Sequence, residues 1–190
     1  FSIPLALGGT YSARAEEFSD YFHHDRYEMT LMSGVMYSPI GADKGRSREY
    51  YTLSGLQFGW MVTDADAGGW WRGNLELSLE AMGGAVFDGK GSYIAGGTAW
   101  LRYNFVQPNW RVVPYLQGGL GAEATDMDRR LIGETFNFNL DVAAGVRCFL
   151  APNWALDLEC RYQHISNATI SKHDVGINAV GPMMGVTYFF

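Results

Sequence analysis

The chain lacks several features that mark common classes of protein. Only 18% of its residues are charged, and its 14 lysines and arginines, outnumbered by 20 acidic residues, form no basic run. A net charge of −6 without a basic stripe argues against a nucleic-acid partner, which would need clustered cations. No stretch reaches the roughly 18 to 20 apolar residues of a membrane-spanning helix. These absences exclude nucleic-acid binding and a helical membrane protein.

Cysteine is also scarce. The two cysteines, Cys148 and Cys160, lie on the apolar side of neighbouring expected strands. Pairing across the turn at Pro152 places Cys148 several positions from Cys160, too far for disulfide geometry. We therefore predict two free thiols that pack as small hydrophobic side chains.

Glycine and hydrophobic residues are abundant instead, at 24 residues and 47% of the chain. Strand-type runs occur at 28–38, 49–63, 72–87, 92–105, 110–124, 134–149, 154–168 and 177–190, and no segment has a convincing helical period. We predict one all-β domain of eight antiparallel strands over 27–190, preceded by an N-terminal arm over 1–26. The first 15 residues resemble the tail of a secretory signal peptide, with an ordinary N-terminal arm as the alternative.

The expected strands alternate between apolar and polar residues. Leu75, Leu77 and Leu79, for example, alternate with Glu76 and Ser78. Successive strand side chains point to opposite faces, so a closed sheet would have one apolar and one polar surface. We predict an eight-stranded transmembrane β-barrel of the outer-membrane type, with the apolar set facing lipid and charges of both signs in a narrow lumen. The soluble alternative is a lipocalin-like barrel with the apolar set inside.

The connections between the expected strands alternate in length. Tight turns are expected at 107–110 and 151–154, with a slightly longer one at 64–71. The connections between them, 39–48, 125–133 and 169–176, are longer and less regular, apart from a brief one at 88–91. Outer-membrane barrels have short periplasmic turns and longer outer loops. The turn-flanking residues expected in an inner aromatic girdle are Trp70, Trp71, Trp110 and Trp154. Pro114 and Pro182 cannot donate to a ladder, and each predicts a bulge or a local gap in pairing.

A polar pair interrupts the apolar side of the seventh strand. That side consists of Trp154, Leu156, Leu158, Cys160 and Tyr162, and is continued by His164 and Ser166. Trp154 and Ser166 are 12 positions apart. At ~3.3 Å per residue and a tilt of ~40°, this distance spans roughly 30 Å, against an apolar band ~25 Å tall. The pair is therefore expected to face the membrane near its outer interface, where the alternative is a polar rim without catalytic function.

The sequence around this pair, His164-x-Ser166-Asn167-Ala168 followed by Gly176-Ile177-Asn178 and a final strand, resembles the lipid A 3-O-deacylase family of outer-membrane acyl ester hydrolases. The resemblance implies that Ser166 is the nucleophile and His164 its base, and a serine hydroxyl does need an adjacent base to react. It also implies a location in the bacterial outer membrane, lipopolysaccharide (lipid A) of the outer leaflet as the substrate, and no cofactor.

The third member of the triad departs from the family pattern. Family enzymes with a full triad carry glutamate where this chain has Asn178, which can hold the histidine ring but cannot stabilise imidazolium with a charge. Asp174 is the alternative acid, and the family's proposed oxyanion asparagine aligns near it. Asn167 has lumen parity, so we expect it to anchor the strand end, with a polar contribution to substrate binding.

A non-enzymatic small outer-membrane barrel, structural or adhesive, is the alternative function, with the triad as a relic. No metal site is expected, because the adjacent His23 and His24 should point apart and the loop residues Asp43, Asp126 and Asp128 lack EF-hand spacing. Self-association into a homodimer is left open.

Overall fold

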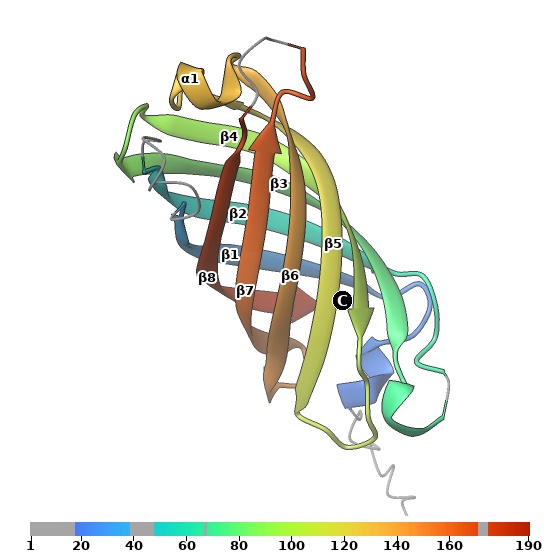
Figure 1. The fold of residues 1–190 in the computed structure, drawn as a ribbon. Helices are drawn as coiled ribbons and strands as arrows, with labels where there is room; N and C mark the ends of the chain where they lie inside the picture. Colours follow the sequence, from blue (N-terminus) through green and yellow to red (C-terminus); the bar gives the residue numbers. More distant parts are fainter. Residues whose placement is uncertain (1–17, 39–47, 67, 171–174) are drawn as a thin grey trace, which may run out of the picture.

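The computed structural model describes residues 18–38, 48–66, 68–170 and 175–190, which form a closed antiparallel barrel in chain order (Figure 1). Its strands are β1 (Tyr27–Tyr37), β2 (Tyr50–Met61), β3 (Asn74–Asp88), β4 (Tyr93–Asn104), β5 (Val112–Thr125), β6 (Phe136–Ala151), β7 (Trp154–Ser166) and β8 (Ile177–Phe189). Pairing of β1 with β8 closes the sheet. The predicted eight-stranded barrel is confirmed, and every strand ends within two residues of its expected bounds.

Short elements lie outside the sheet. These are the 3-10 turns η1 (Phe18–Tyr21) and η3 (Gly69–Trp71) and the helical turn α1 (Arg129–Ile132), which lies at the opposite end of the barrel from η1 (Figure 1). No helix in the described ranges is long and apolar enough to cross a membrane. The signal-like segment 1–15 and Asp43 lie outside the described residues.

The two faces of the sheet have the predicted character. Leu79 and Leu120 are each 68% exposed on the outer wall, whereas Glu76 and Asp141 are fully buried in the lumen. An apolar wall that continues around a barrel suits a hydrocarbon surrounding and not water. The soluble lipocalin-like alternative, which needs the apolar set inside, is therefore wrong.

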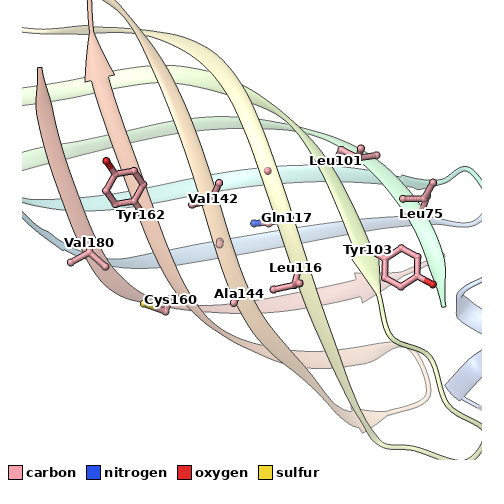
Figure 2. Close-up of a pocket in the computed structure, with 12 residues that line it drawn as sticks. Leu75, Leu101, Tyr103, Leu116, Gln117, Val142, Ala144, Cys160, Tyr162 and Val180 are labelled. Carbon is pink, nitrogen blue, oxygen red and sulfur yellow. The ribbon is translucent and has the colours of Figure 1, made fainter. Parts of the chain in front are cut away.

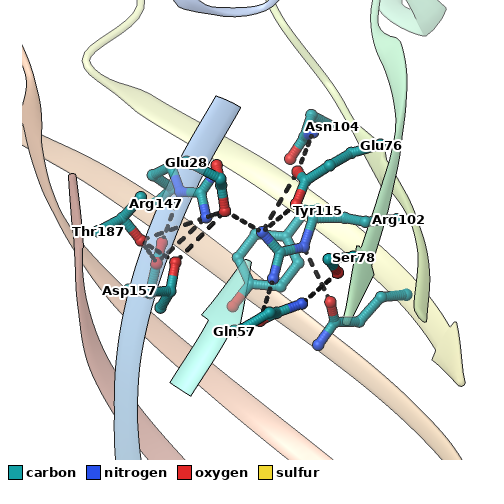
Figure 3. Close-up of polar contacts among 12 residues, drawn as sticks. Glu28, Gln57, Glu76, Ser78, Arg102, Asn104, Tyr115, Arg147, Asp157 and Thr187 are labelled. Carbon is teal, nitrogen blue, oxygen red and sulfur yellow. Dashed lines mark hydrogen bonds and ion pairs between the residues drawn. The ribbon is translucent and has the colours of Figure 1, made fainter. Parts of the chain in front are cut away.

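Buried arginines join the strands across the middle of the lumen (Figure 3). Arg102 of β4 contacts Glu28 of β1 and Glu76 of β3 at 3.1 and 3.2 Å, and Arg147 of β6 contacts Glu28 and Asp157 at 2.5 and 2.8 Å. A third set consists of Arg161, Glu80 and Glu159. A buried ion is tolerated only when partners offset its lost hydration, and these partners come from several strands. The network therefore fixes which face of each strand points inward.

Apolar clusters close the lumen at both ends, although the sequence predicted a polar interior. Beside η1, the rings of Tyr21 and Phe22 pack against Phe149 and Phe189 with centroids 5.3 to 6.0 Å apart. The cluster at the other end consists of Met32, Met36, Tyr51, Leu53, Met82, Ile94, Met127, Leu131, Ile132, Ile165, Ile177, Ala179 and Met183. Buried polar side chains such as Asn74 and Asn137 accompany these clusters, but the arginine network lies between them.

The connections at the two ends differ less in length than expected. One end has 38–49, 89–92, 126–135 and 167–176, and the other has 62–73, 105–111 and 152–153. The 62–73 connection is long because it carries η3 and the bridge between Asp66 and Gly73. The tight 152–153 turn marks this end as periplasmic. The girdle tryptophans Trp70, Trp71, Trp110 and Trp154 lie there and are exposed.

The two prolines differ in their effect on pairing. Pro182 leaves a gap, because the β1–β8 ladder passes from Met183 to Val180 without it. Pro114 is in register with Val146 of β6, and its carbonyl accepts the N–H of Phe105, but the β4–β5 register stops at the preceding pair, Asn104 with Tyr115. Of the predicted bulge or gap, no bulge forms in the described ladders of β5, and the pairing with β4 ends at Pro114. The missing N–H of Pro114 is tolerated because the β4–β5 ladder has already ended.

The cysteines lie as predicted. Cys148 is in register with Leu156 and Cys160 with Ala144 of the paired strand, so the two thiols are far apart along the β6–β7 ladder. Both are free.

Replacing Arg147 with leucine should destabilise the barrel by about 3–5 kcal/mol, because Glu28 and Asp157 would keep buried charges without their shared partner. Denaturant unfolding in detergent micelles, followed by tryptophan fluorescence, measures the loss. Arg48→Leu, which removes an exposed arginine, is the control and should change the unfolding free energy by less than about 1 kcal/mol. Equal effects of the two substitutions would contradict the assigned role of the network.

Candidate active site

The predicted polar pair lies where β7 reaches the outer rim. Ser166 is the last residue of β7, and His164 is in register with Leu140 of β6 and with Asn178 of β8. Their side chains are partly exposed on the outer wall, whereas Ile165 between them is fully buried. The structure therefore brings Ser166, His164 and Asn178 to one lipid-facing patch. Asp174 lies outside the described residues.

Within this patch, the histidine contacts the asparagine. Nδ1 of His164 lies 2.7 Å from Oδ1 of Asn178. Since an amide oxygen only accepts, this contact requires the proton on Nδ1, and in the neutral ring the lone pair of Nε2 is then free. The side chains of Ser166 and His164, both in the described part of the chain, share no hydrogen bond here. Catalytic hydrogen bonds are often long before substrate binds, and the two residues share a face of one strand.

A tyrosine that the sequence placed in the apolar wall contacts the same amide. Tyr162 donates its hydroxyl proton to Oδ1 of Asn178 at 2.6 Å. The alternation along β7 predicts the correct face for Tyr162 but no polar role. The contact runs diagonally across the β7–β8 pair, where His164 is opposite Asn178 and Tyr162 is opposite Val180. Only the register between these strands reveals it.

The connection between β5 and β6 supports the site from the outer end, where α1 lies beside the ends of β7 and β8 (Figure 1). The carbonyl oxygen of Leu131 accepts the N–H groups of Val175 and Gly176 at 2.8 and 3.0 Å. Asn167 is fully buried and donates its amide to the carbonyl of Ile132 at 2.6 Å. The α1 turn is therefore joined to both strands that carry the site.

Gly176 lies directly against the histidine ring. Its φ is +74°, and a Cβ atom at this position would lie 2.8 Å from Cε1 of His164. Glycine adopts this backbone conformation without strain and leaves room for the ring. The loop thus limits how His164 can move.

An open apolar groove in the outer wall begins beside the site (Figure 2). It has a volume of about 630 Å³ and extends from Tyr162 and Val180 across β7, β6 and β5. Several of its lining residues are small, including Gly118, Ala144 and Cys160. The lining also includes larger apolar side chains, among them Leu101, Leu116 and Val142, so the whole hollow presents an apolar surface.

The lipid A 3-O-deacylase (PagL) family model matches residues 32–187 of this sequence. The chain belongs to this family. The sequence resemblance is thereby confirmed, and with the barrel fold it establishes the bacterial outer membrane as the location. The comparison with curated proteins gives no match.

Several solved barrels are similar in fold to this PagL-family chain. The outer membrane enzyme PagL is 17% identical with a TM-score of 0.60, and the match covers 83% of this chain and 97% of that one. Neisserial surface protein A is 18% identical with a TM-score of 0.61, over 87% and 97%. The N-terminal barrel domain of Pseudomonas aeruginosa OprF is 18% identical with a TM-score of 0.55, over 88% and 98%. Identities this low show the shared fold alone.

Two loop carboxylates at the outer rim of this family member form hydrogen bonds and ion pairs with other groups of the protein. Asp126 accepts bonds from the hydroxyl and N–H of Ser92 and from the N–H of Tyr93 at 2.7 to 3.0 Å. These bonds, that of the Ser92 hydroxyl foremost, lower the pKa of Asp126 to about 2. Asp128 pairs with Lys90 and Arg130. The described residues hold no group of three or more histidine, cysteine or acidic ligands for a metal.

Asn167→Ala should free α1 from the end of β7, because the substitution removes the bond to the carbonyl of Ile132. Hydrogen exchange at the N–H groups of Val175 and Gly176, which donate to Leu131, should speed up by about tenfold. Asn153→Ala removes a similar bond, to the carbonyl of Phe189, at the periplasmic end and is the control. Unchanged exchange in Asn167→Ala would show that Asn167 does not anchor α1.

The hydrogen bonds of Asp126 with Ser92 and Tyr93 join the 126–135 connection to the start of β4, and they should weaken in strong acid. A carboxylate with a lowered pKa stabilises the folded state above its unfolded pKa, and this contribution is lost as the pH falls from about 4 through about 2. The amide NMR shifts of Ser92 and Tyr93 should titrate with a midpoint near the lowered pKa of Asp126, about 2. In Asp126→Asn the titration should vanish, and its persistence would mean that another group is responsible.

Proposed function

We propose that this chain is a lipid A deacylase that hydrolyses an ester-linked acyl chain of lipopolysaccharide, with Ser166 as nucleophile and His164 as base. The observation that carries the proposal is the bond from Nδ1 of His164 to Asn178, on the face of β7 that also carries Ser166. In the neutral ring this bond leaves Nε2 unprotonated. That tautomer is the one in which histidine can take the serine proton.

The reaction would follow the two-step course of serine esterases. The Ser166 oxygen attacks the ester carbonyl while Nε2 of His164 takes the hydroxyl proton. The imidazolium then returns this proton to the departing sugar oxygen, and an acyl-serine remains. Water, deprotonated by His164, releases the fatty acid and restores the serine. Asn178 holds the ring throughout, with Asp174 as the alternative acid.

The position of the site supports a lipid substrate. Ser166 and His164 lie at the outer end of the apolar wall, where the ester bonds of lipid A meet the surface of the hydrocarbon. A lipid can therefore reach the site by lateral diffusion without leaving the membrane. The groove that begins at Tyr162 offers an apolar path for an acyl chain.

A non-enzymatic surface barrel is the second candidate function, and one observation favours it. Asn178 is neutral where family enzymes with a full triad have glutamate, so the imidazolium lacks a paired anion among the described residues around His164. The fold similarity to Neisserial surface protein A is compatible with either function. Incubation with lipopolysaccharide separates the two candidates.

Ser166→Ala should leave the barrel folded and lower acyl release at least a thousandfold, because the nucleophile is lost. Mass spectrometry of lipopolysaccharide after incubation with the purified protein in detergent measures release, and heat-modifiable migration on gels reports folding. Ser33→Ala, which removes a wall serine bonded to Ser54, is the control and should retain activity. Undiminished release by Ser166→Ala would remove Ser166 from the mechanism, and no release by the unmodified protein would favour the non-enzymatic barrel.

A further inference from the structure

We infer that Tyr162 is a positioning residue that keeps the amide oxygen of Asn178 turned toward His164. In this way a neutral asparagine can orient the histidine where other family members use a carboxylate. This inference rests on the proposed function. It concerns a contact found on this chain's own wall, between two side chains of β7 and one of β8.

Asparagine introduces a problem of orientation that glutamate does not have. Both oxygens of a carboxylate accept hydrogen bonds, whereas an amide has an acceptor on one side and a donor on the other. If the NH2 group of Asn178 faced His164, Nδ1 would have to accept and Nε2 would carry the proton. A histidine in that tautomer cannot take a proton from Ser166. The direction of the Asn178 amide therefore decides whether the base is usable.

The hydroxyl of Tyr162 favours the productive direction. Two donors converge on Oδ1 of Asn178, the Tyr162 hydroxyl at 2.6 Å and Nδ1 of His164 at 2.7 Å. In the reversed amide the tyrosine could only accept, and its own proton would face the apolar wall. A hydroxyl at a lipid-facing surface has little water to replace a lost acceptor, so the reversed state is disfavoured.

The strand register makes this arrangement specific. Tyr162 and His164 are two residues apart on β7 and point to the same face, and Asn178 is directly opposite His164 on β8. The ring of Tyr162 also lines the groove (Figure 2). Tyr162→Phe keeps this ring and removes only the hydroxyl, so it separates positioning of the amide from packing against an acyl chain.

Tyr162→Phe should lower kcat for acyl release about tenfold to hundredfold, the factor expected for a lost partially buried hydrogen bond, and should change KM less than about threefold. The ¹⁵N NMR signals of His164, identified by their loss in His164→Gln, should shift toward the tautomer protonated at Nε2. Tyr188→Phe removes another wall tyrosine hydroxyl, on β8 opposite Trp154 at the periplasmic end, and should alter neither readout.

The isosteric variant Asn178→Asp provides a second test. Its carboxylate accepts in either orientation, so adding Tyr162→Phe in this background should lower kcat less than about threefold. An equal loss in both backgrounds, or an unchanged His164 tautomer in Tyr162→Phe, would overturn the inference. These outcomes are distinct from failure of the proposed function, which would appear as no acyl release by the unmodified protein, and the tautomer measurement needs no activity.

Discussion

The buried pairing of arginines with carboxylates from other strands is the interaction on which the rest of the molecule depends. Arg161 illustrates this, since it contacts Glu80 of β3 and Glu159 of its own strand in the closed lumen. Side chains alternate along a strand, so holding Arg161 inside directs its neighbour Tyr162, and then His164 and Ser166, toward lipid. A shift of the β7 register by one residue would turn Tyr162, His164 and Ser166 into the lumen. The position of the candidate site is thus a consequence of charges on the other side of the wall.

The membrane also changes what an asparagine can do in a triad. A glutamate at position 178 would bring a full charge to the edge of the hydrocarbon, where charges are poorly solvated. Asn178 avoids that charge in the resting state but gives up the attraction to imidazolium when the histidine is protonated. What remains to the amide is control of ring orientation and tautomer. That control depends on hydrogen bonds from its neighbours.

Most of the fold could be predicted from the sequence because apolar and polar residues alternate along the strands of a barrel wall, and this alternation is visible in the sequence. The alternation of Leu77 and Leu79 with Glu76 and Ser78 gives strand type and facing without knowledge of the partners. The effect of Pro114 on pairing could not be predicted, because it depends on where the neighbouring β4–β5 ladder ends. The ring of Phe22 was also beyond the sequence, since nothing in the arm indicates that it packs against Phe149 and Phe189.

For the candidate site, the sequence predicted which face of the sheet the residues lie on but not which side chains contact one another. Parity and length placed Ser166 and His164 outward at the rim, where they lie. The contacts of Asn178 with His164 and Tyr162 depend on how β7 and β8 pair, and the 167–176 connection between them does not determine this register from its length. The Leu131 carbonyl that binds Gly176 comes from a different connection altogether.

The packed interior has one more consequence, for permeability. Fully buried side chains occupy the described barrel at three levels, with Phe22 near the periplasmic end, Arg102 in the middle and Met36 near the outer end. An eight-stranded barrel is just wide enough for its inward side chains, so this lumen does not offer the wide aqueous channel of a porin. The groove and the candidate site accordingly lie on the outer surface of the wall.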